Sequence, residues 1–172
     1  MKNKTIWSNR FKNKTSLSFQ KIGSSVHIDK RLYEQDIAAS IVHTQMLTKQ
    51  KIIDSKDGTK IINGLKKIKS LIDKGNFEFK DKFEDIHLNV EKKLFEIIGP
   101  SAGFLHTARS RNDQVVTDFK LWIKNASKEI LKDITLVMKN IIKKAEKNTD
   151  TVMPGLTHLK NAQPISFAHY LL

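Results

Sequence analysis

The sequence predicts an all-α protein in which a domain of short helices is followed by the beginning of a bundle of long helices. Apolar residues recur every three or four positions in most of the chain. No stretch of useful length alternates between apolar and polar residues as a half-buried strand does. Residues 113–151 contain neither Gly nor Pro, which allows a helix of about 35 residues, roughly 50 Å long. We place the domain boundary between residues 111 and 112, so that residues 112–172 begin the bundle.

The first two helices are predicted from their apolar spacing and from residues that typically start or stop helices. Residues 1–28 look irregular, and a helix is expected from an N-cap at Asp29 to about Gln50. A turn and cap at residues 57–59 is expected to begin a second helix, which Gly75 ends.

The later elements are predicted in the same way. A third helix is expected over residues 86–97, stopped by Gly99-Pro100, and the long helix follows. Residues 151–165 form a polar loop interrupted by Pro, and a new helix starts at Ser166. Because the sequence stops on an apolar helix face at residues 167–172, we expect it to be the N-terminal part of a longer protein or a truncated gene product.

Composition narrows the class of protein. The formal net charge is +13, but the Lys residues are spread over the chain rather than gathered in one stripe, which argues against nucleic-acid binding. No apolar run approaches the roughly 20 residues of a membrane span, and no apolar segment follows the N-terminus as in a secretion signal. The absence of Cys excludes disulfides and thiolate metal sites and fits a cytoplasmic protein.

The few Arg residues are informative in a chain so rich in Lys. They are Arg10, Arg31, Arg109 and Arg111. Arg is needed where a planar, bidentate guanidinium matters, and Lys cannot replace it there. Two of them lie in residues 106–114, which are polar or small and lead into the long helix. Guanidinium groups and the free N–H groups of a helix N-terminus both favour carboxylate or phosphate, so this segment is a candidate site for a small anion. Asn112 could instead serve only as the N-cap of the long helix, and the two roles are compatible.

Histidines are the candidates for proton transfer. His158 lies in the loop bounded by Pro and Gly, where a pKa near neutrality suits acid–base chemistry, although it could simply tie the loop by hydrogen bonds. His87 shares a predicted helix with Asp85, which points to a different face, and with Glu91, which is four residues later and can support it. The residues alone favour a structural His87. Ser25 by itself carries almost no signal.

Five motifs in this order and spacing resemble the argininosuccinate lyase family of the fumarase/aspartase superfamily. They are Trp7-x-x-Arg10-Phe11, Ser25-x-x-x-Asp29-x-Arg31-Leu32, Glu84-Asp85-Ile86-His87-x-Asn89-x-Glu91, His106-Thr107-Ala108-Arg109-Ser110-Arg111-Asn112-Asp113-Gln114 and Pro154-Gly155-Leu156-Thr157-His158-Leu159. The chain departs from the family pattern at three places: Ser8-Asn9 replaces Gly-Gly, Ala108 replaces Gly, and Lys160-Asn161 replaces Gln-Arg. Ala108 is the most consequential, because Ala tolerates a positive φ less well than Gly.

The resemblance implies a reaction and an assembly. The reaction is the reversible β-elimination of argininosuccinate to arginine and fumarate in arginine biosynthesis, without a metal or an organic cofactor. The assembly is a homotetramer with each active site built from three subunits around a central bundle of long helices. The resemblance also implies a mobile loop beyond residue 172 that supplies a catalytic serine, so the 172 residues alone are expected to be inactive.

The resemblance also implies the site residues. His158 is one of two acid–base groups, and Ser25, Asn112 and Thr157 bind substrate. Such donors stabilise the negative charge that builds on the substrate carboxylate when the neighbouring carbon loses its proton. We add Arg111 as a carboxylate fork and Ser110 as a further substrate-binding group. His87, which the family places near the active site, is also expected to bind substrate.

Three other interpretations remain open. Another lyase of the superfamily, such as adenylosuccinate lyase or fumarase, shares the chemistry, but the joint presence of residues 84–87 and 109–113 favours argininosuccinate. A non-catalytic helical-bundle protein and a basic nucleic-acid-binding module are the others. Salt-dependent DNA binding would support the last of these.

Overall fold

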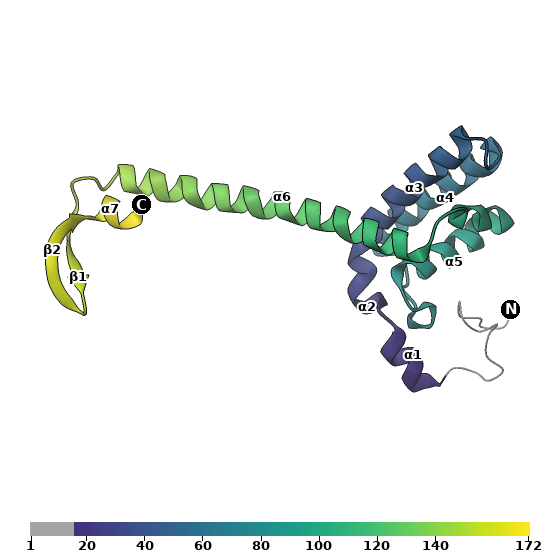
Figure 1. The fold of residues 1–172 in the computed structure, drawn as a ribbon, viewed down its shortest axis with the longest axis horizontal. Helices are drawn as coiled ribbons and strands as arrows, with labels where there is room; N and C mark the ends of the chain where they lie inside the picture. The colour runs from purple at the N-terminus through teal and green to yellow at the C-terminus, as the bar shows by residue number, and fades with distance from the viewer. Residues whose placement is uncertain (1–15) are drawn as a thin grey trace. The chain divides into compact units, whose positions relative to one another are not determined.

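The computed structural model of the protein describes residues 16–172, which are largely helical (Figure 1). The all-α prediction is confirmed, with a small two-stranded sheet as an addition. Internal contacts divide the chain into two compact units, the first ending at Trp122 and the second being Ile123–Leu172. The predicted domain boundary between residues 111 and 112 stays a prediction. None of the helices in residues 16–172 combines the length and the apolar character that crossing a membrane requires.

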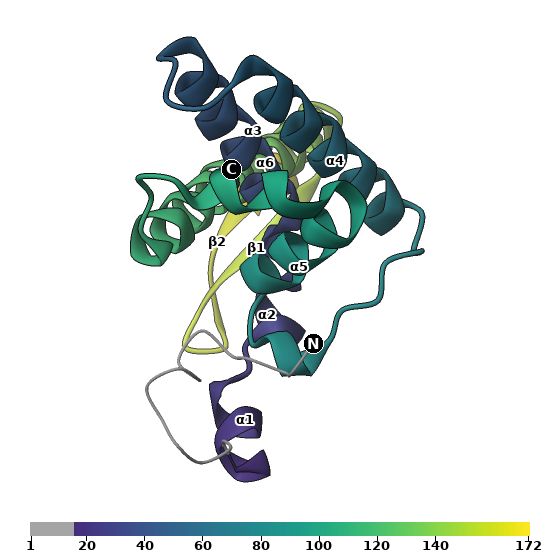
Figure 2. The same ribbon diagram turned by 90° about the vertical axis from the view of Figure 1, so that its right-hand side faces the viewer.

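The first unit is built around three helices. Its elements are α1 (Leu17–Gly23), α2 (Val26–Asp29), η1 (Lys30–Leu32), α3 (Tyr33–Lys49), α4 (Ser55–Asp73), η2 (Asp81–Phe83), α5 (Ile86–Ile98) and η3 (Gly99–His106). Helices α3, α4 and α5 pack side by side, as the two views show (Figure 2). The core between them is aliphatic and includes Ile37, Leu47, Ile61, Leu65, Ile68, Ile86, Val90 and Leu94. These residues come from the apolar positions that recur every three or four residues in the three segments, and packing of the helices brings them together.

The starts of the predicted helices need correction. Asp29 is the last residue of α2 and stands at the N-cap position of η1, but its side chain makes no capping hydrogen bond there. Its carboxylate accepts hydrogen bonds from the Ser25 hydroxyl (2.6 Å) and from the backbone N–H of Ile86 (3.0 Å). The Asp29 carboxylate therefore satisfies the first backbone N–H group of α5. No local sequence pattern indicates this contact between distant residues. Residues 17–29 are helical for most of their length rather than irregular, and Trp7 and Arg10 lie outside the described residues.

The predicted turn at residues 57–59 is also wrong, because α4 already begins at Ser55 after an N-cap at Asp54. Gly58 lies where α4 passes close to α3. A Cβ atom at Gly58 would collide with the hydroxyl of Thr48, so this glycine permits a close helix contact rather than a turn.

The long helix is confirmed as α6 (Arg111–Glu146), which has 36 residues. In its second half, large apolar side chains are mostly exposed: Ile130 is 59% exposed, Leu131 65%, Ile134 51% and Val137 57%. Near its end, α7 (Phe167–Leu171) is held by hydrogen bonds from the backbone N–H groups of Phe167 and Ala168 to residues 151 and 148. The predicted start of this last helix is confirmed, because the Ser166 hydroxyl caps it.

The prediction of a loop over residues 151–165 is wrong. These residues form largely an antiparallel hairpin of β1 (Val152–Thr157) and β2 (Lys160–Ser166). The two connecting residues, His158 and Leu159, have φ of 50° and 61°. Positive φ at both positions is what the tightest hairpin turns require. The strands were not predicted from the sequence because both of their faces are largely exposed, and such strands show no alternation of apolar and polar residues. The two prolines tolerated within them face each other in a two-stranded ribbon, where every strand is an edge.

The core analysis leads to a prediction for Leu94, which is fully buried in α5. Leu94→Ala should lower the free energy of unfolding by about 2–5 kcal/mol, because it removes buried methyl groups and leaves a cavity. Chemical denaturation measures the loss. Lys92→Ala, at an exposed position of the same helix, is the control and should change stability by no more than about 0.5 kcal/mol. Equal effects of the two substitutions would contradict this description of the core.

Candidate functional site

The polar segment between η3 and α6 is anchored on α3. Ala108 has a φ of 54°, so this non-glycine residue adopts the left-handed conformation. On one side of it, the ring Nε2 of His43 hydrogen-bonds the Thr107 carbonyl (2.9 Å). On the other side, the Nη1 of Arg109 donates to the Ser40 hydroxyl (3.1 Å). The segment is therefore held at both flanks of its strained residue.

At the beginning of α6, two short polar side chains accept hydrogen bonds from backbone N–H groups. The Ser110 hydroxyl accepts from the N–H of Asn112 (3.2 Å), and the Asp113 carboxylate accepts from the N–H of Ser110 (3.4 Å). These side chains satisfy N–H groups at the helix start, and the alternative of Asn112 as N-cap is wrong, because Asn112 is already the second helical residue. The side chains of Ser110 and Asn112 are both exposed at the positive end of a long helix dipole.

Arg111, between them, turns toward the protein. Its Nη2 forms an ion pair with Glu91 (2.9 Å) and its Nη1 donates to the Gln114 side-chain oxygen (2.9 Å), while its Nε lies 3.9 Å from Asp85. The predicted support of His87 by Glu91 is therefore wrong, because the Glu91 carboxylate pairs with Arg111 instead. A substrate contact by Arg111 stays a prediction, and in this chain its guanidinium is already engaged on two sides.

Arg111, Glu91 and Asp85 form a first polar cluster, and a second polar cluster is fully buried. It joins Asp36 of α3, His87 of α5, and Gln114 and Asp118 of α6. The His87 Nδ1 lies 3.0 Å from Asp36 and 3.5 Å from Asp118, and Gln114 donates a short hydrogen bond to the same Asp36 oxygen that His87 contacts. His87 is only 1% exposed, so its substrate contact also stays a prediction.

The sequence analysis missed Asp36 and Asp118, although their spacing along their helices could have indicated them. Asp36, Ser40 and Thr44 are buried in the same stripe of α3 as Leu47, at spacings of three and four residues. Gln114 and Asp118 repeat this spacing on α6. Polar residues at core positions of a helix are expected to be paired with one another.

Burial and charge set opposite protonation behaviour within the cluster. Burial alone would raise the pKa of Asp36 and lower that of His87, but their mutual hydrogen bond and attraction outweigh it. The pKa of Asp36 is therefore lowered and that of His87 raised, as in an ion pair. Asp118 is the odd group: burial first, and the negative charge of Asp36 second, raise its pKa to about 7.

The same cluster contains the three residues with metal-ligand chemistry that lie together among residues 16–172. Asp36, His87 and Asp118 have ligand atoms within 4.8 Å of one another. However, the Nδ1 of His87 is held by the Asp36 carboxylate, and a protonated ring nitrogen cannot bind a cation. The donor set therefore suits a hydrogen-bonded ion pair better than a metal.

Ser25 is placed near the first cluster through the segment before α5. Its backbone N–H donates to the Glu84 carbonyl (2.8 Å), and its hydroxyl donates to Asp29, which in turn accepts from Ile86. The residue between Glu84 and Ile86 is Asp85, the neighbour of Arg111. Ser25 is thus joined by a chain of contacts to the start of α6.

Thr157 and His158 lie at the tip of the hairpin in the second unit, and both are exposed. The ring of His158 has no hydrogen-bond or ion-pair partner among residues 16–172, so it does not tie the hairpin together. The predicted residues thus divide between the units: Ser25, His87, Ser110, Arg111 and Asn112 in the first, and Thr157 and His158 in the second.

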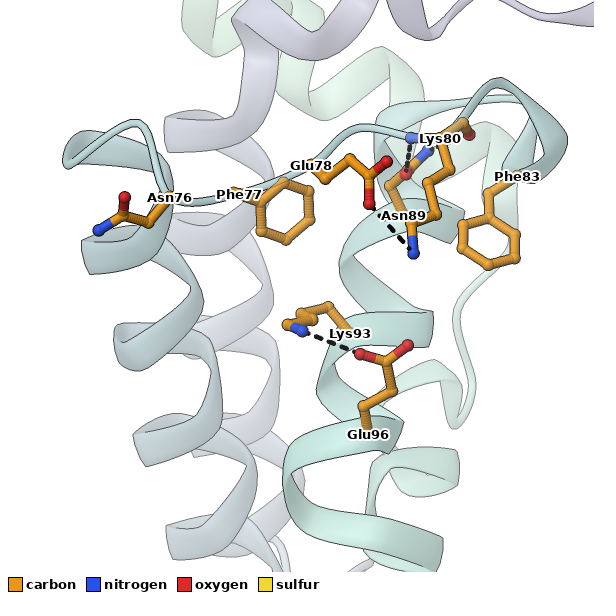
Figure 3. A pocket seen from close by; sticks show the side chains of 8 residues that line it. All are labelled: Asn76, Phe77, Glu78, Lys80, Phe83, Asn89, Lys93 and Glu96. Carbon is orange, nitrogen blue, oxygen red and sulfur yellow. Dashed lines mark hydrogen bonds and ion pairs between the residues drawn. The ribbon is translucent and has the colours of Figure 1, made fainter.

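A pocket of about 260 Å³ lies between the segment before η2 and α5, and it contains none of the predicted residues (Figure 3). Its charges are paired internally, Lys93 with Glu96 (2.9 Å) and Lys80 with Glu78 (3.3 Å). The Asn89 side chain is used by the backbone of Lys80. The pocket therefore offers no free charge to a ligand.

Known proteins resemble the chain over nearly all of its length. A family model described as "Lyase" matches residues 9–172. The argininosuccinate lyase of Pelagibacter ubique (strain HTCC1062) is 56% identical over 99% of this chain and 37% of its own length. The argininosuccinate lyase of Bartonella bacilliformis (strain ATCC 35685 / KC583 / Herrer 020/F12,63) is 46% identical over 97% of this chain and 36% of its own length. The chain thus spans little more than a third of the length of these relatives.

Solved structures show the same fold. An EDDS lyase in complex with formate has a TM-score of 0.71 and 26% identity, covering 90% of this chain and 30% of its own. A variant of EDDS lyase with bound fumarate has a TM-score of 0.71 and 25% identity, covering 93% of this chain and 32% of its own. The fumarate lyase from Mesorhizobium sp. BNC1, with a TM-score of 0.65 at 20% identity over 81% and 33%, supports the fold alone.

The buried cluster leads to a prediction of pH-dependent stability. Folded Asp118, with its pKa raised to about 7, keeps a proton that the unfolded chain loses above about pH 4. The free energy of unfolding should therefore fall as the pH rises from about 4 to 7, by at most about 1.4 kcal/mol per pH unit from this group. The His87 contribution is complete below its ordinary pKa and is lost as the pH rises through its raised pKa, which acts in the same direction.

Asp118→Asn should flatten this decline in the free energy of unfolding, because it removes the titrating carboxyl group and nearly preserves the shape of the side chain. Denaturant unfolding at a series of pH values between about 5 and 8 measures the slope. Asp133→Asn, at an exposed position of the same helix, should keep the slope of the unmodified protein. Parallel curves for the Asp118 variant and the unmodified protein would show that Asp118 does not hold this proton.

Proposed function

Since this chain belongs to the lyase family, we propose that it is part of an argininosuccinate lyase, which splits argininosuccinate reversibly into arginine and fumarate in arginine biosynthesis. The observation that carries the proposal is the 46–56% identity to argininosuccinate lyases over at least 97% of the chain. The EDDS lyases are only 25–26% identical, which favours argininosuccinate over another substrate of the superfamily.

The proposed chemistry is a β-elimination in which a base removes a proton from the carbon beside a substrate carboxylate. The electrons of that C–H bond form the C=C bond of fumarate, the C–N bond breaks, and its electron pair leaves with nitrogen. Nitrogen then takes a proton to complete arginine. Negative charge develops on the carboxylate, so fixed donors directed at it lower the barrier.

We propose His158 as one of the two acid–base groups. Its support is that the ring is exposed, lies at a hairpin turn and has no partner within residues 16–172. Thr157, next to it in sequence, is proposed to donate its hydroxyl to substrate. The second acid–base group is proposed to be the loop serine that the family resemblance implies.

Ser25, Ser110 and Asn112 are proposed to contact the substrate carboxylates. Ser110 and Asn112 combine exposed donors with the N-terminal end of a 36-residue helix, an arrangement that favours anions. Arg111 and His87 complete the proposed set. Their present partners, Glu91 and Asp36, indicate that they shape the site from behind.

A homotetramer is proposed, in which long helices of other subunits cover α6. The support is the stripe of exposed apolar residues along its second half, which a single helix cannot bury. A cytoplasmic location is proposed because a chain without Cys suits a reducing compartment.

The first experiment is turnover of argininosuccinate by the protein at its natural length, followed through the ultraviolet absorbance of fumarate. Release of fumarate from argininosuccinate, and not from adenylosuccinate, supports the proposal. Preference for adenylosuccinate, or no turnover of either, would overturn it. The 172-residue chain alone should be inactive, because the proposed loop serine is not part of it.

His158→Asn should lower turnover of the protein at its natural length by roughly 10²–10⁴-fold, the usual effect of losing an acid–base group. The matched control is His169→Asn in α7, which should retain turnover. A loss of less than about threefold in the His158→Asn variant would remove His158 from the mechanism, whereas equal losses in both variants would indicate a general disturbance of the second unit.

A further inference from the structure

Gln114 connects the two polar clusters of the first unit. It is only 3% exposed, and both ends of its carboxamide are used. Its nitrogen donates to the Asp36 carboxylate in the buried cluster, and its oxygen accepts from the Nη1 of Arg111 (2.9 Å) in the cluster nearer the surface. No other residue in the described part of the chain bridges Asp36 and Arg111 directly.

The chemistry of the two partners allows only one orientation of this carboxamide. A guanidinium offers donors only, and an ionised carboxylate offers acceptors only. Reversing the amide would place donor against donor and acceptor against acceptor. A Glu at this position would put a second negative charge beside Asp36, and an apolar residue would remove one hydrogen bond from the Asp36 carboxylate and one from the Arg111 guanidinium.

Arg111 transmits this restraint to the start of α6. Gln114 holds its Nη1 and Glu91 holds its Nη2, so the guanidinium plane is fixed from two sides. Arg111 lies between Ser110 and Asn112, whose exposed side chains are proposed to contact the substrate. Fixing the Arg111 side chain therefore restricts the backbone that presents both neighbours.

We propose that Gln114 is a positioning residue, which ties Arg111 to the buried Asp36–His87 pair and thereby holds Ser110 and Asn112 in place for a substrate carboxylate. The inference rests on the proposed function. It assigns Gln114 no contact with substrate, and its effect on binding passes entirely through Arg111.

The test uses the protein at its natural length and Gln114→Met, which keeps the length and apolar volume of the side chain but removes both hydrogen bonds. KM for argininosuccinate and the inhibition constant of fumarate should rise by about 10-fold or more, as expected for hydrogen bonds to charged groups, and kcat should change less. The control is Gln35→Met, another buried Gln, whose side-chain oxygen has no hydrogen bond. It should leave both constants unchanged.

A double-mutant cycle separates positioning from packing. If Gln114 acts through Arg111, then Gln114→Met combined with Arg111→Lys should weaken fumarate binding no more than the stronger single substitution. Additive losses, or constants within threefold of the unmodified protein in a folded Gln114→Met variant, would overturn the proposal.

If Gln114→Met does not fold, Gln114→Glu carries the same test. It keeps the acceptor for Arg111 but replaces the donor to Asp36, so KM should again rise, and an unchanged KM would overturn the proposal. Absence of argininosuccinate turnover in the unmodified protein would overturn the proposed function and this inference together. Normal turnover with unaffected variants would overturn the positioning role alone.

Discussion

The contact between Asp36 and His87 is the constraint on which the rest of the first unit depends. It joins α3 to α5 across 51 residues of sequence at a point where neither side chain reaches water. An ionised group buried without a partner costs several kcal/mol, so the two helices must meet in the register that pairs them. The apolar core between α3, α4 and α5 would tolerate small shifts, because aliphatic packing is not directional. The ion pair does not, and Gln114 and Asp118 extend the same requirement to the beginning of α6.

One face of α3 consequently determines the conformation of the whole polar segment. Asp36, Ser40 and His43 follow one another at spacings of four and three residues, and they contact Gln114, Arg109 and the Thr107 carbonyl respectively. These contacts bracket Ala108, whose left-handed backbone costs of order 1–2 kcal/mol in a residue with a Cβ atom. The departure of this chain from the family glycine is therefore compatible with the fold, because three tertiary contacts hold the turn that glycine would otherwise adopt freely.

The sequence predicted what repeats locally and missed what depends on distant partners. Apolar periodicity was sufficient for α3 to α6, and the Ser166 cap was sufficient for α7. Asp29 and Asp57 looked like helix starts because Asp prefers such positions, but the first satisfies the N–H of Ile86 and the second contacts Ser101, 44 residues away. The hairpin was missed because strands exposed on both faces need no apolar alternation. At the site, the exposed Ser110 and Asn112 followed from the helix start, whereas Asp36 and Asp118 become meaningful only when three helices meet.

The use of Arg in this Lys-rich chain has a more specific meaning than the sequence suggested. Arg111 was predicted to bind a substrate carboxylate, which stays a prediction, and Arg109 was the alternative structural partner. Within the chain both donate to side chains of the protein itself, Arg109 to Ser40 and Arg111 to Gln114, with Glu91 as a further partner of Arg111. Arg31 likewise donates to the backbone carbonyl of Ile28. For Arg109 and Arg111 the planar geometry matters because their guanidinium groups donate in fixed directions within a partly buried region, which a Lys ammonium does less well. Arg109 and Arg111 therefore belong to the framework of the first unit that holds the start of α6, where the hydroxyl of Ser110 and the amide of Asn112 are exposed.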